Sequence, residues 1–281
     1  MPLILPGNVG SATAATGFNV ANSLRFNDDD SPYMVQAVGT PTDIDKVTFS
    51  TWVKLSGTTT MTFLGCHYDT NNRTFFQILA DGDVKFLIKE GGTDIAQLIT
   101  DRKLRDVSAW FHLVIAIDTT QSTDTNRIKL YINGVQETSF STATYLDQNT
   151  DLRIQTNGQT SNVGRLAATG NHIDGYLAET VLIDGQQLAA DQFGEFDEDS
   201  PTIWKPKDVS GLTFGDNGFY LEYKETGTSQ NSSGIGADTS GNTNHLSVSG
   251  LAATDQATDT PTNNFATLNA LEYSGGGKTF S

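Results

Sequence analysis

The feature that most restricts the fold of this chain is a two-residue alternation of apolar and polar side chains, broken by short turns of Gly, Asn and Asp. In RIKLYINGV, the side chains of Ile128, Leu130 and Ile132 fall on one face of an extended strand. Asn133-Gly134 then supplies two residues that tolerate positive φ, which predicts a type I′ turn. This segment therefore predicts a β-hairpin with one buried face.

The same alternation recurs along the chain. Asp81-Gly82 predicts a second hairpin turn between two alternating stretches. YLAETVLI (176–183) is apolar on both faces, so we expect its strand to be covered on both sides. The other segments with this pattern are FSTWVKL (49–55), FFQILADGDVKFLI (75–88) and WFHLVIAID (110–118).

One short helix is predicted, at residues 188–196, from two alanines and from the spacing of Leu188, Gln192 and Phe196. Strands at short intervals, separated by turns and not by helices, are typical of a sandwich or barrel. The predicted fold class is therefore all-β.

Length and composition narrow the function. A chain of 281 residues can bury a full core, and its 17 basic and 33 acidic residues give a net charge of −16. Such an acidic chain is not expected to bind nucleic acid, which requires a basic surface. Cys66 is the single cysteine, so no internal disulfide framework is expected. The chain lacks a long apolar run and a basic N-terminal signal region, and we expect no membrane insertion.

Composition also divides the chain into three parts. Residues 1–22 are small and polar and predict an N-terminal arm, residues 23–225 hold the sandwich, and residues 226–281 form a loop-rich segment that completes it and ends in a flexible tail. Leu3, Ile4 and Leu5 are an apolar run within the arm, which we expect to pack against a neighbouring subunit or partner. A homo-oligomer is the expected state. The alternative is a disordered chain start.

The order of four motifs resembles the laminin-G-like, concanavalin A-like family. A Trp-containing strand (Trp52) is followed by a W-x-H strand (His112), an LYINGV hairpin and a strand with a glutamate (Glu179) that runs into a short helix. The resemblance covers residues 23–196. It implies a jelly-roll β-sandwich with one short helix.

A second resemblance concerns the C-terminal half. DGQQL, DQFGEFDEDSPTIWKP and the segment from IGADTSGNTNH to FATLN are similar to laminin-G-like proteins of bacteriophages, especially marine ones. Those proteins are described as virion structural or tail-fibre proteins. The resemblance implies a virion location, other virion proteins as partners, and a role as a capsid decoration or tail-associated subunit. The alternative is a carbohydrate-binding adhesin that recognises host surface glycans.

The displaced segment DTSGNTNHLSVSGL resembles the opening of many laminin-G-like domains. We therefore expect its strand to complete the sandwich beside the N-terminal segment SLRFNDDDSPYM.

Carboxylates were weighed as a catalytic pair because related glucanases carry several acids on one strand. Glu195, Asp197 and Asp199 in EFDEDS come closest, but the string follows the predicted helix and precedes a proline. A solvated acidic loop is the favoured interpretation. Glu179 has no acidic partner two residues away and is expected to accept turn amides. No enzyme is predicted.

Histidine and cysteine add no reactive pair. The four histidines lack metal-binding spacing. His112 is expected to be a packed strand residue, and Cys66 a partly buried thiol, because adjacent residues such as Cys66 and His67 point to opposite faces of a strand.

The sequence leaves open whether the chain binds calcium or a sugar. Asp28, Asp30, Asp238 and Asn242 are candidate calcium ligands, because calcium prefers such oxygens. Asp and Asn are also ordinary turn residues, and the turn interpretation is favoured, so no cofactor is predicted.

For a sugar, three aromatic side chains could stack on a pyranose ring. They are Trp52, Tyr68 and Tyr131. In most sandwiches such residues belong to the core, and the sequence does not locate the site.

Overall fold

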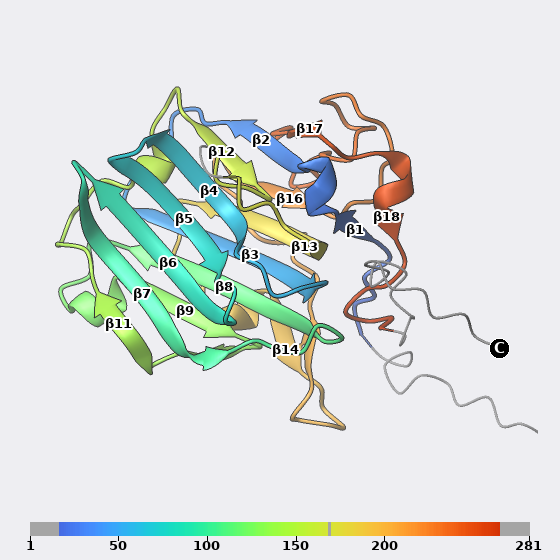
Figure 1. Cartoon of the computed structure of the whole chain (residues 1–281), viewed down its shortest axis with the longest axis horizontal. Coiled ribbons are helices and arrows are strands. Elements are labelled where there is room, and N and C mark those ends of the chain that lie inside the picture. Colours follow the sequence, from blue (N-terminus) through green and yellow to red (C-terminus); the bar gives the residue numbers. More distant parts are fainter. Residues whose placement is uncertain (1–16, 168–169, 265–281) are drawn as a thin grey trace, which may run out of the picture.

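The computed structural model describes residues 17–167 and 170–264, and it places two eight-stranded antiparallel sheets face to face (Figure 1). Sheet A has the order β10-β9-β8-β3-β13-β1-β18, with β16 paired to β13. Sheet B has the order β11-β7-β6-β5-β4-β12-β2-β17. The predicted all-β sandwich is confirmed.

The strand bounds are as follows. Sheet A contains β1 (Ser23–Phe26), β3 (Lys46–Leu55), β8 (Trp110–Asp118), β9 (Ile128–Ile132), β10 (Val135–Gln136), β13 (Gly175–Asp184), β16 (Phe219–Leu221) and β18 (Gln256–Ala257). Sheet B contains β2 (Tyr33–Ala37), β4 (Met61–Asp69), β5 (Asn72–Ile78), β6 (Asp83–Glu90), β7 (Thr93–Lys103), β11 (Phe140–Thr144), β12 (Thr160–Val163) and β17 (Ser247–Ser249). A separate two-stranded sheet pairs β14 (Gly194–Phe196) with β15 (Trp204–Pro206).

The central core lies between the sheets and follows the predicted alternation. Leu113 and Ile115 of β8 point into it from sheet A, beside Phe49 of β3, and Phe76 and Phe86 meet them from sheet B. Phe76 lies opposite Phe86 in register, so the predicted hairpin across Asp81-Gly82 is confirmed.

The outer face of sheet A is covered by the chain that follows β13. Val181 and Ile183 of β13 pack against Phe193 and Phe214 on this outer side, while Leu182 of the same strand faces the central core. The strand predicted to be covered on both sides is therefore covered on both sides.

The outer face of sheet B is left mostly uncovered. Phe75 and Leu87 lie there side by side in register, and of the buried described residues only Leu166 forms a cluster with them. The two sheets thus differ: sheet A is buried on both faces, and sheet B presents one face to solvent.

The C-terminal segment adds one strand to each sheet. Strand β17 pairs with β2 at Val35, Met34 and Tyr33. Strand β18 pairs with β1, where Ser23 lies opposite Ala257 (Figure 1).

The predicted arm extends too far, however. Val20 is only 2% exposed and packs in a cluster with Trp52 and Trp110, so the chain is already part of the folded unit before residue 22.

The helix predicted over residues 188–196 is wrong. A 3₁₀ turn at Ala190–Gln192 takes its place, followed by β14. A Cβ at Gly194 would lie 2.6 Å from the Trp204 ring, so the chain here has to run close beside β15, which a continuing helix would prevent. The other 3₁₀ turns are Asp28–Asp30, Asp124–Asn126, Arg153–Gln155 and Ala253–Asp255. Within the described residues, no helix has the length and apolar character to cross a membrane.

Candidate ligand-binding site at the rim of the sandwich

A pocket of about 300 Å³ opens at the end of the sandwich where β3 and β7 end. Three segments enclose it: residues 57–59 after β3, residues 79–82 between β5 and β6, and residues 104–107 after β7. Its lining residues are Leu55, Gly57, Thr58, Thr59, Ile78, Leu79, Ala80, Asp81, Gly82, Leu104, Arg105 and Val107. We call this the rim pocket.

The turn between β5 and β6 holds the pocket wall in place. A Cβ at Gly82 would lie 2.7 Å from the carbonyl oxygen of Leu104, and Gly82 has a φ of +94°, so glycine is required for this close approach. The amide of Leu104 donates to the carbonyl of Gly82 at 2.8 Å. The side chains of Leu55, Ile78 and Leu104 are buried and form an apolar base.

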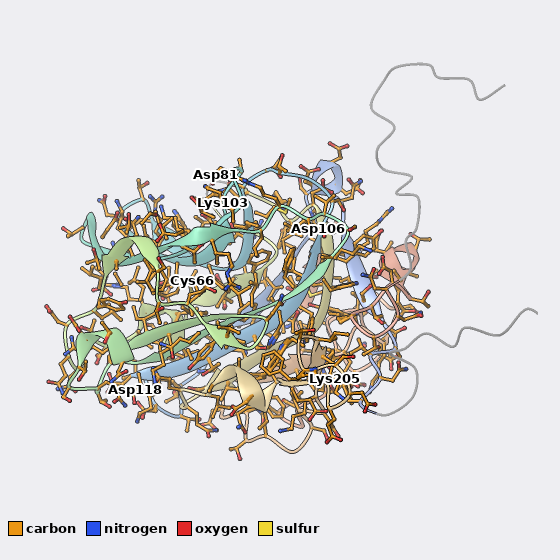
Figure 2. The ribbon with its side chains drawn as sticks, turned by 90° about the horizontal axis from the view of Figure 1, so that it is seen from below. Cys66, Asp81, Lys103, Asp106, Asp118 and Lys205 are labelled. Atoms are coloured by element: carbon orange, nitrogen blue, oxygen red, sulfur yellow. The ribbon has the colours of Figure 1, made fainter. Side chains whose placement is uncertain are left out.

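A charged group stands at the pocket mouth. Lys103 Nζ lies 2.6 Å from Asp81 Oδ2 and 2.7 Å from Asp83 Oδ1, so one ammonium bridges two carboxylates (Figure 2). The hydrogen bond from Lys103 lowers the pKa of Asp81 and raises the pKa of Lys103. Asp81 is therefore ionised and exposed, with oxygen lone pairs facing solvent as acceptors.

The remaining polar groups of the rim pocket are exposed as well. Thr58 and Thr59 carry hydroxyls on one wall, and Arg105 on the opposite segment forms no ion pair with a described residue. Val107 beside it is 41% exposed, an unusual value for an aliphatic side chain. The pocket therefore combines an aliphatic base with hydroxyl, carboxylate and guanidinium groups at its mouth.

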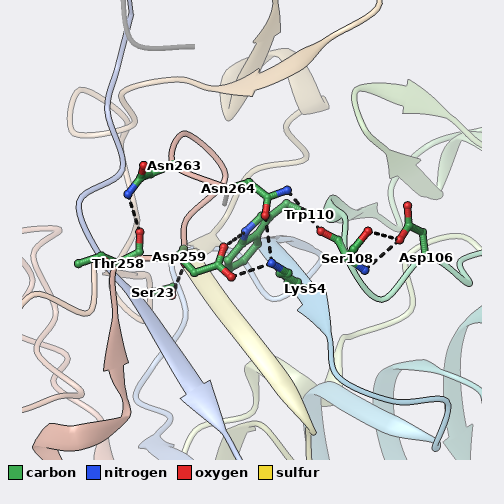
Figure 3. Close-up of polar contacts among 9 residues, drawn as sticks. All are labelled: Ser23, Lys54, Asp106, Ser108, Trp110, Thr258, Asp259, Asn263 and Asn264. Carbon is green, nitrogen blue, oxygen red and sulfur yellow. Dashed lines mark hydrogen bonds and ion pairs between the residues drawn. The ribbon is translucent and has the colours of Figure 1, made fainter. Parts of the chain in front are cut away.

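A partly buried polar cluster supports the third wall of the pocket, residues 104–107 (Figure 3). Lys54 Nζ pairs with Asp259 Oδ2 at 2.6 Å and donates to Asn264 Oδ1 at 3.0 Å. Trp110 Nε1 donates to the other Asp259 oxygen at 3.0 Å. Asn264 Nδ2 donates to the carbonyl of Ser108 at 3.3 Å, so the C-terminal segment is fastened to the loop that carries Arg105 and Val107. We call this the clamp.

The β14–β15 hairpin forms a second exposed feature. Phe196 lies opposite Trp204, with ring centroids 4.9 Å apart at 70°, and Phe196 is 44% exposed. Trp204 is anchored because its Nε1 donates to His112 Nδ1 at 3.0 Å and its ring stacks on the imidazole.

The acids of EFDEDS lie at this hairpin and not along one strand. Glu195 belongs to β14, whereas Asp197 Oδ1 accepts the amides of Asp199 and Ser200 in the turn that follows. Lys205 Nζ lies 3.4 Å from both Glu195 and Asp197. The geometry is that of a turn whose carboxylates are held by amides and one lysine.

Comparison with known families identifies the sandwich. A laminin G family model, described as the concanavalin A-like lectin/glucanases superfamily, matches residues 28–191, more than half of the chain. The chain belongs to this family. No curated protein sequence matches it at a significant level.

Solved structures share the fold at low identity. A heptameric SAP-like pentraxin from Limulus polyphemus is 14% identical, covers 63% of this chain and 82% of its own, and has a TM-score of 0.46. The CBM40 of Ruminococcus gnavus IT-sialidase, bound to α2,3-sialyllactose, is 13% identical, with coverages of 60% and 93% and a TM-score of 0.41.

Tailspike protein 2 of Escherichia coli O157:H7 bacteriophage CAB120 is 14% identical, with coverages of 61% and 23% and a TM-score of 0.43. The laminin-G-like domain described here therefore spans less than a quarter of that tailspike chain.

Two of the three aromatic residues predicted as sugar platforms are buried in this laminin-G-like domain. Trp52 is 3% exposed and stacks on His112 at 4.8 Å, and Tyr131 is 8% exposed within the cluster that covers sheet A. Neither ring offers a face to a sugar. Tyr68 is half-buried, its hydroxyl donates to the carbonyl of Arg153, and the Arg153 guanidinium lies 5.9 Å from its ring centre.

The calcium candidates are turn residues. Asp238 Oδ1 accepts the amides of Tyr220 and Ser240, and Oδ2 accepts the Ser240 hydroxyl and the amide of Asn244. Asn242 donates its amide to the carbonyls of Gly215 and Gly218.

Asp28 and Asp30 sit apart, in an exposed 3₁₀ turn, where Asp30 accepts from the Asn27 side chain at 2.9 Å. The part of the chain that the structure describes holds no group of three or more His, Cys, Asp or Glu suited to a metal ion. The described structure therefore does not gather these four residues into one such group.

The expected packing of His112 and Cys66 is observed. His112 is fully buried, its Nε2 contacts Ser50 Oγ at 2.8 Å, and burial lowers its pKa to about 3, so it is neutral. Cys66 is 0% exposed between the sheets (Figure 2), and burial raises its pKa to about 12. Its Sγ donates to the carbonyl of Thr160 at 3.0 Å. Neither group reaches solvent.

Glu179 differs from its predicted role of accepting turn amides. It occupies a β-bulge in β13 with a φ of +49°, is 7% exposed, and accepts a hydrogen bond from the Tyr220 hydroxyl. Burial, as the largest cause, raises its pKa to about 7. The predicted assembly residues Leu3, Ile4 and Leu5 lie outside the described residues.

The rim pocket was missed in the sequence because its walls come from three turns that period-two patterning does not connect. Asp81 was read only as a turn residue. The signal available was that β5 and β7 are alternate strands of an antiparallel meander, so the segments that follow them lie at the same end of sheet B.

Proposed function

We propose that this chain is a carbohydrate-binding sandwich that holds a sugar unit in the rim pocket. The observation that carries the proposal is the pocket itself: about 300 Å³, with an aliphatic base for the C–H face of a sugar and hydroxyl, carboxylate and guanidinium groups at the mouth. Membership of a lectin/glucanase family supports it. Asp81 and Arg105 are the groups we expect to bind sugar hydroxyls.

A glycan array followed by calorimetry tests the proposal. Asp81→Asn removes one charged acceptor, and because such a hydrogen bond contributes about 1.5–3 kcal/mol, we expect affinity to fall at least about tenfold. Asp147→Asn is the control, since Asp147 is an exposed aspartate that does not line the pocket and belongs to none of the three segments that enclose it. Binding that is unaffected by Asp81→Asn and by Arg105→Gln would refute the assignment.

We further propose binding without hydrolysis. The acids of EFDEDS are spread over a strand and a turn, and Glu179 is buried against Tyr220. Release of reducing sugar from a β-glucan panel by the wild type, abolished in Glu195→Gln or Glu179→Gln, would show that a carboxylate acts catalytically.

We also propose that the sandwich is mounted on a phage particle, as a capsid decoration or tail-associated subunit, and that it assembles as a homo-oligomer. Support comes from the resemblance of its C-terminal half to phage laminin-G-like proteins.

A deletion of residues 2–16 tests this assembly, because Val20 packs in the folded unit and has to be kept. We expect it to leave the β spectrum unchanged and to abolish oligomer formation or incorporation into particles. Normal assembly of the truncated chain would contradict the role of Leu3, Ile4 and Leu5.

A further inference from the structure

The uncovered face of sheet B carries an ordered set of side chains. In register across β5 and β6, Arg73 lies opposite Lys89, Phe75 opposite Leu87, and Gln77 opposite Lys85. Side chains two residues apart on a strand share a face, so these six residues point to the same side. Because Phe75 and Leu87 form the outer cluster with Leu166, that side is the outer one.

Two cations lie beside the ring of Phe75. The Arg73 guanidinium carbon lies 5.9 Å from the ring centre, and Lys85 Nζ lies 5.5 Å from it. Both side chains are half-buried, while the ring between them is 6% exposed. A buried ring is therefore flanked by two half-exposed cations on the outer face of sheet B.

Neither cation is neutralised. Among the described residues, Arg73 and Lys85 form no ion pair, whereas Lys89 in the same group pairs with Asp94 at 3.0 Å. The Nε of Arg73 is shielded from water and has no hydrogen-bond partner. In a chain of net charge −16, three cations on one face, of which Lys89 is the one paired with a carboxylate, are an exception to the general composition.

The electrostatics of Lys85 agree with this geometry. Burial lowers its pKa, and Arg73 and Lys89 lower it further, against the opposing effect of Asp94. An anion placed between Arg73 and Lys85 would relieve both the mutual repulsion and the unmet donor at Arg73.

We propose that this face, centred on Arg73, Phe75 and Lys85, binds the carboxylate or sulfate groups of an acidic polysaccharide. It is a second site, separate from the rim pocket, and does not depend on it. The cations run along two neighbouring strands, from Lys85 past Phe75 to Arg73 and Lys89, which suits anions repeated along a polymer. A polysaccharide whose charges are spaced along one chain is also repelled less by the −16 chain than duplex nucleic acid, which carries one charge per about 1.7 Å.

Affinity electrophoresis of the full chain tests the proposal, in native gels that contain dextran sulfate, polygalacturonate or uncharged dextran. We expect retardation by the two acidic polymers only. Arg73→Gln and Lys85→Gln should each weaken it about tenfold, as expected for loss of one charged hydrogen bond. Lys129→Gln is the matched control, since Lys129 is a half-buried lysine without an ion pair on the opposite sheet.

Each outcome decides the matter. Equal weakening in Lys129→Gln, or no retardation of the wild type at low salt, overturns the proposal. Inorganic sulfate is compared with dextran sulfate at an equal concentration of sulfate groups. If the inorganic ion releases the protein from the polymer, the site binds a single free anion and the polysaccharide proposal is overturned. Stronger binding of a single-stranded oligonucleotide would make the ligand a nucleic acid and overturn the proposal as well.

Circular dichroism confirms folding of the variants. Loss of neutral-sugar binding in Asp81→Asn, with acidic-polymer binding retained, separates this site from the rim pocket.

Discussion

Replacement of Glu179 by glutamine removes a buried ionisable group while keeping its shape and its hydrogen bond from Tyr220. Glu179 is 7% exposed and its pKa is raised from 4.5 to about 7, with burial as the largest cause. A raised pKa means that the folded state binds the proton more tightly than the unfolded chain. The stabilisation is therefore complete below about pH 4.5 and is lost as the pH rises through about 7.

The magnitude follows from the two pKa values. One pKa unit corresponds to about 1.4 kcal/mol, so the full shift represents about 3 kcal/mol. Between roughly pH 5 and pH 8.5, the linkage relation gives about 2.5 kcal/mol, because the unfolded carboxyl is already mostly ionised at the lower pH. Glu179→Gln should therefore gain about 2.5 kcal/mol of unfolding free energy relative to the wild type across this interval.

Urea unfolding of both proteins at the two pH values measures the difference. The quantity to compare is the unfolding free energy of Glu179→Gln minus that of the wild type, at each of the two pH values. The other carboxylates titrate equally in both proteins and cancel in this subtraction. Glu195→Gln is the control, because Glu195 is exposed on the β14–β15 hairpin and should leave the difference constant. A Glu179→Gln difference that is the same at both pH values would show that Glu179 is ionised in the fold, and the reasoning would fail.

Three further outcomes are expected. Lys54→Met leaves Asp259 buried with Trp110 as its remaining side-chain donor and should cost about 3 kcal/mol by denaturant unfolding, whereas Lys207→Met at an exposed site should cost almost nothing. Gly134→Ala should lower Tm more than Gly158→Ala, because both glycines have a φ near +80° but only a Cβ at Gly134 meets a ring, that of Trp204, at 2.4 Å. The Tm should be the same in millimolar calcium and in chelator, because the Asp238 oxygens are occupied by four donors; a calcium-dependent rise would reopen the metal site.

The sequence predicted the local pairings well, because these depend on alternation and on turn residues. Asn133-Gly134 turns between β9 and β10 with φ values of +48° and +79°, as the type I′ turn requires. Alternation tells which residues share a face, but not what covers that face. Alternation therefore leaves Trp52 and Tyr131 open as candidate sugar platforms. In the structure both rings are covered, Tyr131 by the chain after β13 and Trp52 by a cluster that includes Val20 and Trp110.

The rim pocket could not be predicted from the sequence for a related reason. Its walls at 57–59, 79–82 and 104–107 meet only because β4, β5, β6 and β7 lie in sequential order in one sheet. The Arg73 and Lys85 pair depends on the register between β5 and β6 in the same way. Residue type alone gave no reason to place these side chains together.

The first and last strands have a consequence for how the domain is tethered. Ser23 lies opposite Ala257, and the amide of Val20 donates to Thr262 Oγ1 at 3.0 Å, so both ends of the described chain leave the sandwich side by side. The clamp sets this exit next to the rim pocket, through Asn264 and Ser108. A body joined to either end is therefore attached on the same side of the sandwich as the pocket. A circular permutant that links residue 264 to residue 18 and opens at Gly91-Gly92, at the other end of β6, would point the pocket away from its anchor and present it to an approaching surface.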